Sequence, residues 1–170
     1  TLYLVAGLSG SGKSTVARML ARQVGAVLLR SDAVRKHLAG IPLEQQGGDE
    51  VYSPEMTQKT YDRLLQLGIM LATQGYPVIL DAKYDRQALR QAVLQAVEQA
   101  SSPLKLHILH CDAPLETRQE WINQRQGDVS DATAELLPKQ QMEPFTAAEQ
   151  PFVTAIDSTQ DLAAQLKQLF

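Results

Sequence analysis

The sequence has little cysteine, few aromatic residues and no long apolar run. Cys111 is the only cysteine among 170 residues, so a disulfide within the chain is excluded. No apolar run approaches the roughly 18 residues of a membrane span, and the chain does not open on a charged and then apolar leader. We therefore expect a cytoplasmic protein with no membrane partner, in which Cys111 is a buried and unreactive thiol.

An excess of charge of either sign is also lacking. The formal net charge is −3, which provides no overall basic field of the kind that duplex-binding proteins use. A nucleic-acid substrate would therefore have to be held by a local basic patch. The histidines His37, His107 and His110 show no metal-ligand spacing. Hydrophobic residues make up 44% of the sequence, which is enough to bury one core, so we expect a single domain over residues 1–170.

One motif is complete: a glycine-rich phosphate loop of the form G-x-x-x-x-G-K-S near the start of the chain. It lies between an apolar run over 2–6 and a segment in which Val16, Leu20 and Val24 recur at helical spacing. The glycines let successive backbone N–H groups point inward around phosphate oxygens, and the following helix adds the positive end of its dipole. The motif predicts a nucleoside triphosphate held by Gly7, Leu8, Ser9, Gly10, Ser11, Gly12, Lys13, Ser14 and Thr15.

Two residues of the motif carry specific chemistry. Lys13 is expected to bridge the β- and γ-phosphates as a catalytic cation, and Ser14 to give its hydroxyl oxygen to Mg²⁺. The alternative is a Gly/Ser turn that happens to precede a helix, but the full spacing at a strand-to-helix junction makes this a poor explanation. We therefore expect ATP and Mg²⁺ as cofactors.

Strand-like and helix-like segments alternate along the remaining chain, without an internal repeat. Further apolar runs predict strands over 26–29, 77–80, 104–111 and 152–156. Helices are expected between them, with a short one around 133–140, and Ser158 and Asp161 have the spacing of a capping box for a last helix. Five apolar strands separated by helices predict an α/β fold in which a parallel sheet is covered on both faces, a three-layer αβα sandwich.

Three carboxylates follow apolar strands, where ligands gather in a parallel sheet. Asp81 ends the 77–80 strand and is expected to hold the Mg²⁺ shell together with Ser14. Asp32 starts a short helix and is expected to act as a general base that binds the acceptor hydroxyl, although a helix cap explains it as well. Asp112 stands before a helix that begins with a proline, so capping is a sufficient explanation for it.

Arginines supply the candidate anion-binding groups. Arg118 and Arg125 are seven residues apart on one helix, which ends in a glycine-containing acidic segment, so we expect a lid over about 125–135. In this lid Arg125 stabilises the transferred charge, and Arg118 contacts the nucleotide. Arg35 and Arg86 are expected to face the acceptor. Arg90 lies one turn beyond Arg86 on the same helix and could also face an anionic substrate. Surface charge explains Arg90 equally well.

The order of these motifs resembles the predicted kinases of the P-loop class, and more narrowly the AAA_33-type kinase domain. The resemblance rests on Gly7 to Thr15, Arg30-Ser31-Asp32 with Arg35-Lys36, Asp81-Ala82 followed by Arg86, and Arg118/Arg125 followed by Ser130-Asp131-Ala132. Related families are chloramphenicol phosphotransferase, gluconate kinase, zeta toxins and polynucleotide 5′-kinases. The resemblance implies a sheet of order 2-3-1-4-5, ATP with Mg²⁺, a base at Asp32 and lid arginines at Arg118 and Arg125. Such domains are often fused to another domain, and we expect this chain to be part of a longer protein.

The sequence thus predicts an ATP-dependent phosphotransferase that moves the γ-phosphate to a hydroxyl of a small molecule. Two alternatives stay open at this point. One is a polynucleotide 5′-hydroxyl kinase, which would need a basic channel near Arg35, Lys36, Arg86 and Arg90. The other is a nucleotide-binding switch module, which needs the phosphate loop but no acceptor-activating base.

Overall fold

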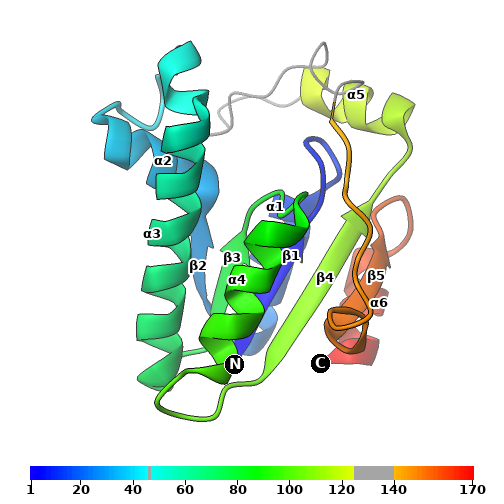
Figure 1. The fold of residues 1–170 in the computed structure, drawn as a ribbon. Coiled ribbons are helices and arrows are strands. Elements are labelled where there is room, and N and C mark those ends of the chain that lie inside the picture. The colour runs from blue at the N-terminus through cyan, green and yellow to red at the C-terminus, as the bar shows by residue number, and fades with distance from the viewer. Residues whose placement is uncertain (46, 125–139) are drawn as a thin grey trace.

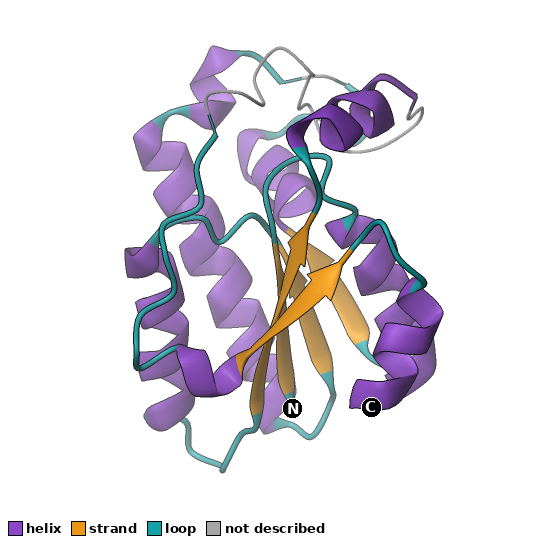
Figure 2. Ribbon diagram, turned by 90° about the vertical axis from the view of Figure 1, so that its right-hand side faces the viewer, coloured by secondary structure: helices purple, strands orange, loops and turns teal. Residues whose placement is uncertain are grey.

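Five parallel strands form one sheet in the order β2-β3-β1-β4-β5 (Figure 1). The structure is a computed structural model that describes residues 1–45, 47–124 and 140–170. Helices cover both faces of the sheet, which gives three layers (Figure 2). The predicted α/β fold and the strand order expected from the resemblance are both confirmed. Among the described residues, no helix combines the length and the apolar character that crossing a bilayer requires.

The elements alternate as the apolar pattern predicts. The strands are β1 (Leu2–Ala6), β2 (Val27–Arg30), β3 (Val78–Asp81), β4 (Leu106–Asp112) and β5 (Val153–Asp157). The helices are α1 (Lys13–Val24), α2 (Ser31–Ala39), α3 (Pro54–Thr73), α4 (Gln87–Glu98), α5 (Leu115–Gln124) and α6 (Leu162–Leu169), with 3₁₀ turns η1 (Asp49–Tyr52) and η3 (Gln150–Phe152).

The central strand β1 is fully buried, and its side chains alternate between two hydrophobic clusters. Leu2 and Leu4 belong to the cluster beneath α3 and α4, whereas Tyr3 and Val5 belong to the cluster beneath α1 and α6. Cys111 lies in the second cluster, where burial raises the pKa of its thiol to about 12. The thiol is therefore protonated at neutral pH, in keeping with the expectation of an inert cysteine.

Two local details differ from the sequence predictions. The last helix is capped by Asp161, whose carboxylate accepts the Ala164 N–H at 3.1 Å, so the capping box led by Ser158 is wrong. The chain between α2 and α3 contains the short 3₁₀ turn η1, which no apolar run or helical spacing in the sequence indicates. The helix expected around 133–140 lies outside the described residues, apart from Gln140, which is not helical.

One ion pair is enclosed completely. The Arg90 guanidinium on α4 lies 3.1 Å from the Glu149 carboxylate, and both side chains have an exposed fraction of 0%. Arg90 also donates to the carbonyl oxygens of Tyr84, Glu143 and Pro144 at 2.8–2.9 Å. Both explanations of Arg90 left open by the sequence, an anion-binding role and surface charge, are therefore wrong. The residue ties segment 140–149 to α4.

Replacing Arg90 with Met should reduce the free energy of unfolding by about 3–5 kcal/mol, because the Glu149 carboxylate would remain buried without a cation. Urea denaturation followed by circular dichroism measures this change. Arg86→Met, one turn away at an exposed position, is the matched control and should leave the unfolding midpoint nearly unchanged. Equal midpoints for the two variants would contradict the structural role of the Arg90–Glu149 pair.

Candidate active site

The phosphate loop joins β1 to α1 in the conformation that its glycines permit. Gly10 and Gly12 have φ angles of +77° and +83°, a region that residues with a Cβ rarely adopt. A Cβ on Gly10 would also lie 2.6 Å from the Arg118 carbonyl oxygen of α5. The Gly7 N–H donates to the Lys83 carbonyl oxygen at 3.1 Å, which fixes the start of the loop to the chain after β3.

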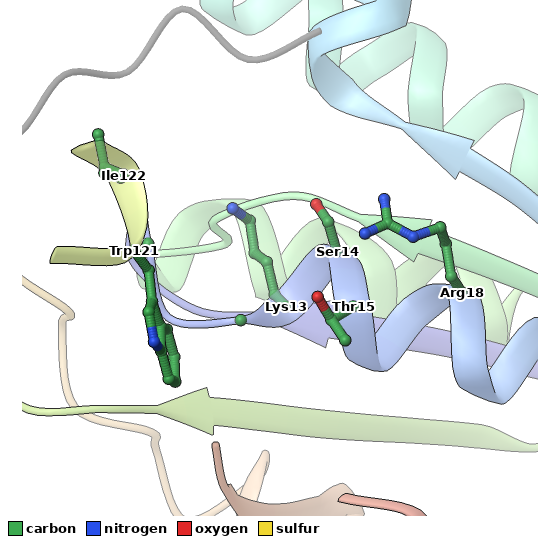
Figure 3. Close-up of a pocket in the computed structure, with 8 residues that line it drawn as sticks. Lys13, Ser14, Thr15, Arg18, Trp121 and Ile122 are labelled. Carbon is green, nitrogen blue, oxygen red and sulfur yellow. The ribbon is translucent and has the colours of Figure 1, made fainter. Parts of the chain in front are cut away.

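A cleft of about 180 Å³ opens beside this loop. In Figure 3 the Lys13 ammonium and the Ser14 hydroxyl point to the same side of α1, and Trp121 of α5 stands beside the loop. The cleft is lined by Gly10, Gly12, Lys13, Ser14, Thr15, Arg18, Trp121 and Ile122. The loop, the first turn of α1 and α5 thus form a cradle that can take phosphate groups.

The predicted metal ligands lie next to each other. The Ser14 hydroxyl donates to Asp81 Oδ2 at 2.9 Å, and the Arg30 guanidinium lies 3.0 Å from Ser14 Oγ and 3.3 Å from Asp81 Oδ2. Burial raises the pKa of Asp81, while the charges of Lys13 and Arg30 and the hydrogen bond from Ser14 act against this shift. One hydroxyl and one carboxylate oxygen suit Mg²⁺, which completes its shell with water and substrate phosphates rather than with a protein cage. These residues therefore fit the expected metal ion.

Asp32 and Lys83 add charge near Asp81. Asp32 lies in the first turn of α2 and is half-buried, and its charge acts on both Asp81 and Lys83. Lys83 is also half-buried, and burial lowers its pKa, with further effects of Asp85, Lys13, Asp32 and Arg35. The charge of Asp32 therefore acts on Asp81, and the role of Asp32 as a general base stays a prediction.

The predicted arginines are placed differently from one another. Arg86 is exposed at the N-cap of α4. Arg35 is buried, and it donates to Val51 O and to Thr57 Oγ1 at 2.9 Å each, so the structure does not present it to an acceptor. Arg118 is buried on α5 and reaches the loop through its backbone carbonyl, while its Nη1 has no hydrogen-bond partner among the described residues. Arg125 and the lid expected over 125–135 lie outside the described residues.

Three residues near the loop were not predicted. Arg30 ends β2 beside Asp81, its partner in the sheet register, and only the spatial pairing of β2 with β3 reveals this contact. Lys83 follows Asp81 by two residues, and no motif in the sequence indicates that it lies half-buried beside the loop. Trp121 lines the cleft one turn after Arg118, and its position on the same helix was the available signal.

Fold and loop together define an α/β domain with a phosphate loop. The AAA_33 family model, described as an AAA domain, matches residues 2–148, and the chain belongs to this family. An uncharacterized protein of Mycobacterium tuberculosis is 32% identical over 139 residues, which are 79% of this chain and 28% of that protein. The chain therefore spans less than a third of the length of this relative.

Two solved structures show the same fold. A sugar kinase from Janibacter sp. has a TM-score of 0.68 at 21% identity, with 99% of this chain and 91% of that chain covered. The APS kinase CysC of Mycobacterium tuberculosis, in complex with AMPPNP and APS, has a TM-score of 0.70 at 20% identity, with 99% and 94% covered. At these identities the likeness is one of fold.

Asp81→Asn should weaken ADP binding in the presence of Mg²⁺ by about tenfold and leave ADP binding without Mg²⁺ nearly unchanged. The reason is that the amide keeps the shape of the side chain and an acceptor for Ser14 but lacks the negative charge. Calorimetric titrations with ADP in the presence of Mg²⁺ and of a chelator separate the two contributions. Asp112→Asn is the matched control, since Asp112 is an exposed carboxylate at the end of strand β4, which is separated from β3 by β1. If both variants bind Mg·ADP as the parent does, Asp81 is not a metal ligand.

Proposed function

We propose that the chain is an ATP-dependent phosphotransferase that moves a phosphoryl group to the hydroxyl of a small molecule. The observation that carries this proposal is the meeting of Ser14 and Asp81 beside Lys13, with the Asp32 carboxylate within electrostatic range. A nucleotide-binding module needs the loop alone, whereas a kinase also needs a base near the terminal phosphate.

Each residue has one task in this proposal. Bound ATP with Mg²⁺ supplies the γ-phosphoryl group and screens its charge. The loop amides and Lys13 hold the phosphates, and Ser14 and Asp81 provide oxygen ligands. Asp32 accepts the proton of the acceptor hydroxyl as the new oxygen–phosphorus bond forms and the bond to the leaving ADP breaks. Arg125 remains the predicted cation for the transferred charge.

The burial of three basic residues favours a small acceptor over a polynucleotide. The alternative function, a kinase that acts on DNA or RNA ends, would need a basic channel that includes Arg35, Lys36 and Arg90. Arg35 and Arg90 are bound inside the protein, and the Lys36 ammonium donates to the Leu43 carbonyl oxygen at 3.2 Å in a side chain 2% exposed. Arg86 is the exposed member of this group. Two proteins that share the fold, a sugar kinase and an APS kinase, are named after small acceptors.

Asp32→Asn should lower phosphoryl transfer by about 10²–10⁴-fold, the usual contribution of a general base, and leave ATP affinity close to that of the parent. Lys13→Ala should instead lose ATP affinity, because it removes the cation at the phosphates. The measurement is transfer of a radiolabelled γ-phosphate to pooled hydroxyl acceptors that include DNA and RNA ends, with ATP affinity measured by calorimetry.

The same screen separates the alternatives. Labelling of polynucleotide ends with a steep loss at rising salt would favour the polynucleotide kinase. Tight ATP binding with no labelled acceptor, and no effect of Asp32→Asn on any nucleotide-dependent property, would favour the switch module. Full transfer by the Asp32→Asn variant would show that Asp32 is not the base.

A further inference from the structure

A side chain from late in the sequence holds the phosphate loop by two hydrogen bonds. The Ser9 N–H donates to Gln140 Oε1 at 3.0 Å, and Gln140 Nε2 donates to Ser9 Oγ at 3.0 Å. Ser9 is 4% exposed, so neither of its groups has free access to water. The two residues are 131 positions apart, and their contact therefore fixes the loop relative to the segment that follows α5.

The chemistry of the pair suits a phosphate site. The Ser9 N–H belongs to neither strand nor helix, so it needs a partner from elsewhere in the chain. A primary amide can accept from this N–H and donate to the hydroxyl at the same time, and it does so without a charge. A carboxylate at the same place would bring a negative charge close to the bound phosphates, and a lysine could not accept the N–H.

Segment 140–149, which carries Gln140, is anchored a few residues further on. It is the yellow-orange trace that runs down from beside α5 in Figure 1. The Glu143 N–H donates to the Asp85 carbonyl oxygen at 2.8 Å, and the Glu143 carboxylate accepts the Gln87 N–H at the start of α4 at 2.8 Å. Gln140 is thus three residues from a point that is fixed to the chain after β3.

The enclosed Arg90 makes this anchor rigid. It binds the Glu143 and Pro144 carbonyl oxygens at 2.9 Å each, and its guanidinium lies 4.3 Å from the centre of the Phe145 ring. Its ion pair with Glu149 closes the far end of the segment. The amide of Gln140 is therefore held against Ser9 by a chain of contacts that leads into the core.

We propose that Gln140 is a positioning residue for the nucleotide site, which acts by fixing the Ser9 peptide in the phosphate loop. This inference rests on the proposed function, since it requires that the loop binds a nucleotide. Loss of the two hydrogen bonds between Gln140 and Ser9 leaves the loop folded but less ordered. The free-energy cost of ordering the loop is then added to nucleotide binding. The effect falls on affinity rather than on the chemical step.

The test compares Gln140→Met with Gln141→Met. Gln141 is the neighbouring glutamine, exposed and without a hydrogen bond to the described residues, and is the matched control. Calorimetric titration with ADP and Mg²⁺ should show binding about tenfold weaker for Gln140→Met, in line with the loss of two neutral hydrogen bonds, and unchanged for Gln141→Met. At saturating ATP the turnover of Gln140→Met should stay near that of the parent, so KM rises while kcat does not fall.

Hydrogen exchange supplies a readout that does not depend on nucleotide. Gln140→Met should speed the exchange of the Ser9 amide in the free protein, whereas amides in the core of β1 keep their protection. Gln140→Glu keeps an acceptor for that amide and should retain its protection, yet bind ADP more weakly because of the added charge. Unchanged Ser9 exchange in Gln140→Met, or equal ADP affinity of parent and variant, would overturn the proposal.

Failure of the proposed function and failure of the Gln140 proposal give different results. A parent protein that binds no ADP contradicts the proposed function and this inference together. A parent that binds ADP and a Gln140→Met variant that binds it equally well contradict the inference alone. A global loss of stability in Gln140→Met would appear as faster exchange throughout the sheet and would also count against a role confined to the loop.

Discussion

The hydrogen bond between the Ser14 hydroxyl and the Asp81 carboxylate joins the start of α1 to the end of β3, and the other site residues are arranged around it. It exists because β1 and β3 are parallel neighbours whose carboxyl ends reach the same edge of the sheet. Ser14, the second residue of the helix after β1, then faces Asp81, the last residue of β3. Arg30 enters by the same geometry, since β2 pairs with β3 in a register that sets Arg30 opposite Asp81.

A buried carboxylate at this position has an electrostatic cost, and the surrounding cations offset it. Burial raises the pKa of Asp81, and Lys13 and Arg30 oppose the shift. The site therefore gathers positive charge for two reasons, to keep Asp81 ionised and to receive phosphates. Arg30 contacts both Ser14 and Asp81, so it balances the same negative charge that a metal ion held by the two proposed ligands would balance.

The sequence predicted the sheet and the loop because both depend on local patterns. Apolar runs gave the strands, the glycine spacing gave the loop, and a carboxylate after a strand pointed to Asp81. The sequence could not give the roles of Arg35 and Arg90, because most of their partners lie 16 or more positions away and include backbone carbonyls, which no residue type reveals. Gln140 is a sharper case, since a glutamine in a polar stretch gives no sign that it holds Ser9.

The positions of the cations bear on which class of acceptor this edge of the sheet could bind. Arg35 and Arg90 satisfy carbonyl and carboxylate oxygens of the protein itself, and a guanidinium committed in this way is not available to an external anion. Lys13 and Lys83 remain beside the loop, half-buried, together with the carboxylates Asp32 and Asp85. A polymer of phosphates needs several cations along its path, and this mixed set offers few. This distribution of charge supports the proposal of a compact acceptor over that of a polynucleotide.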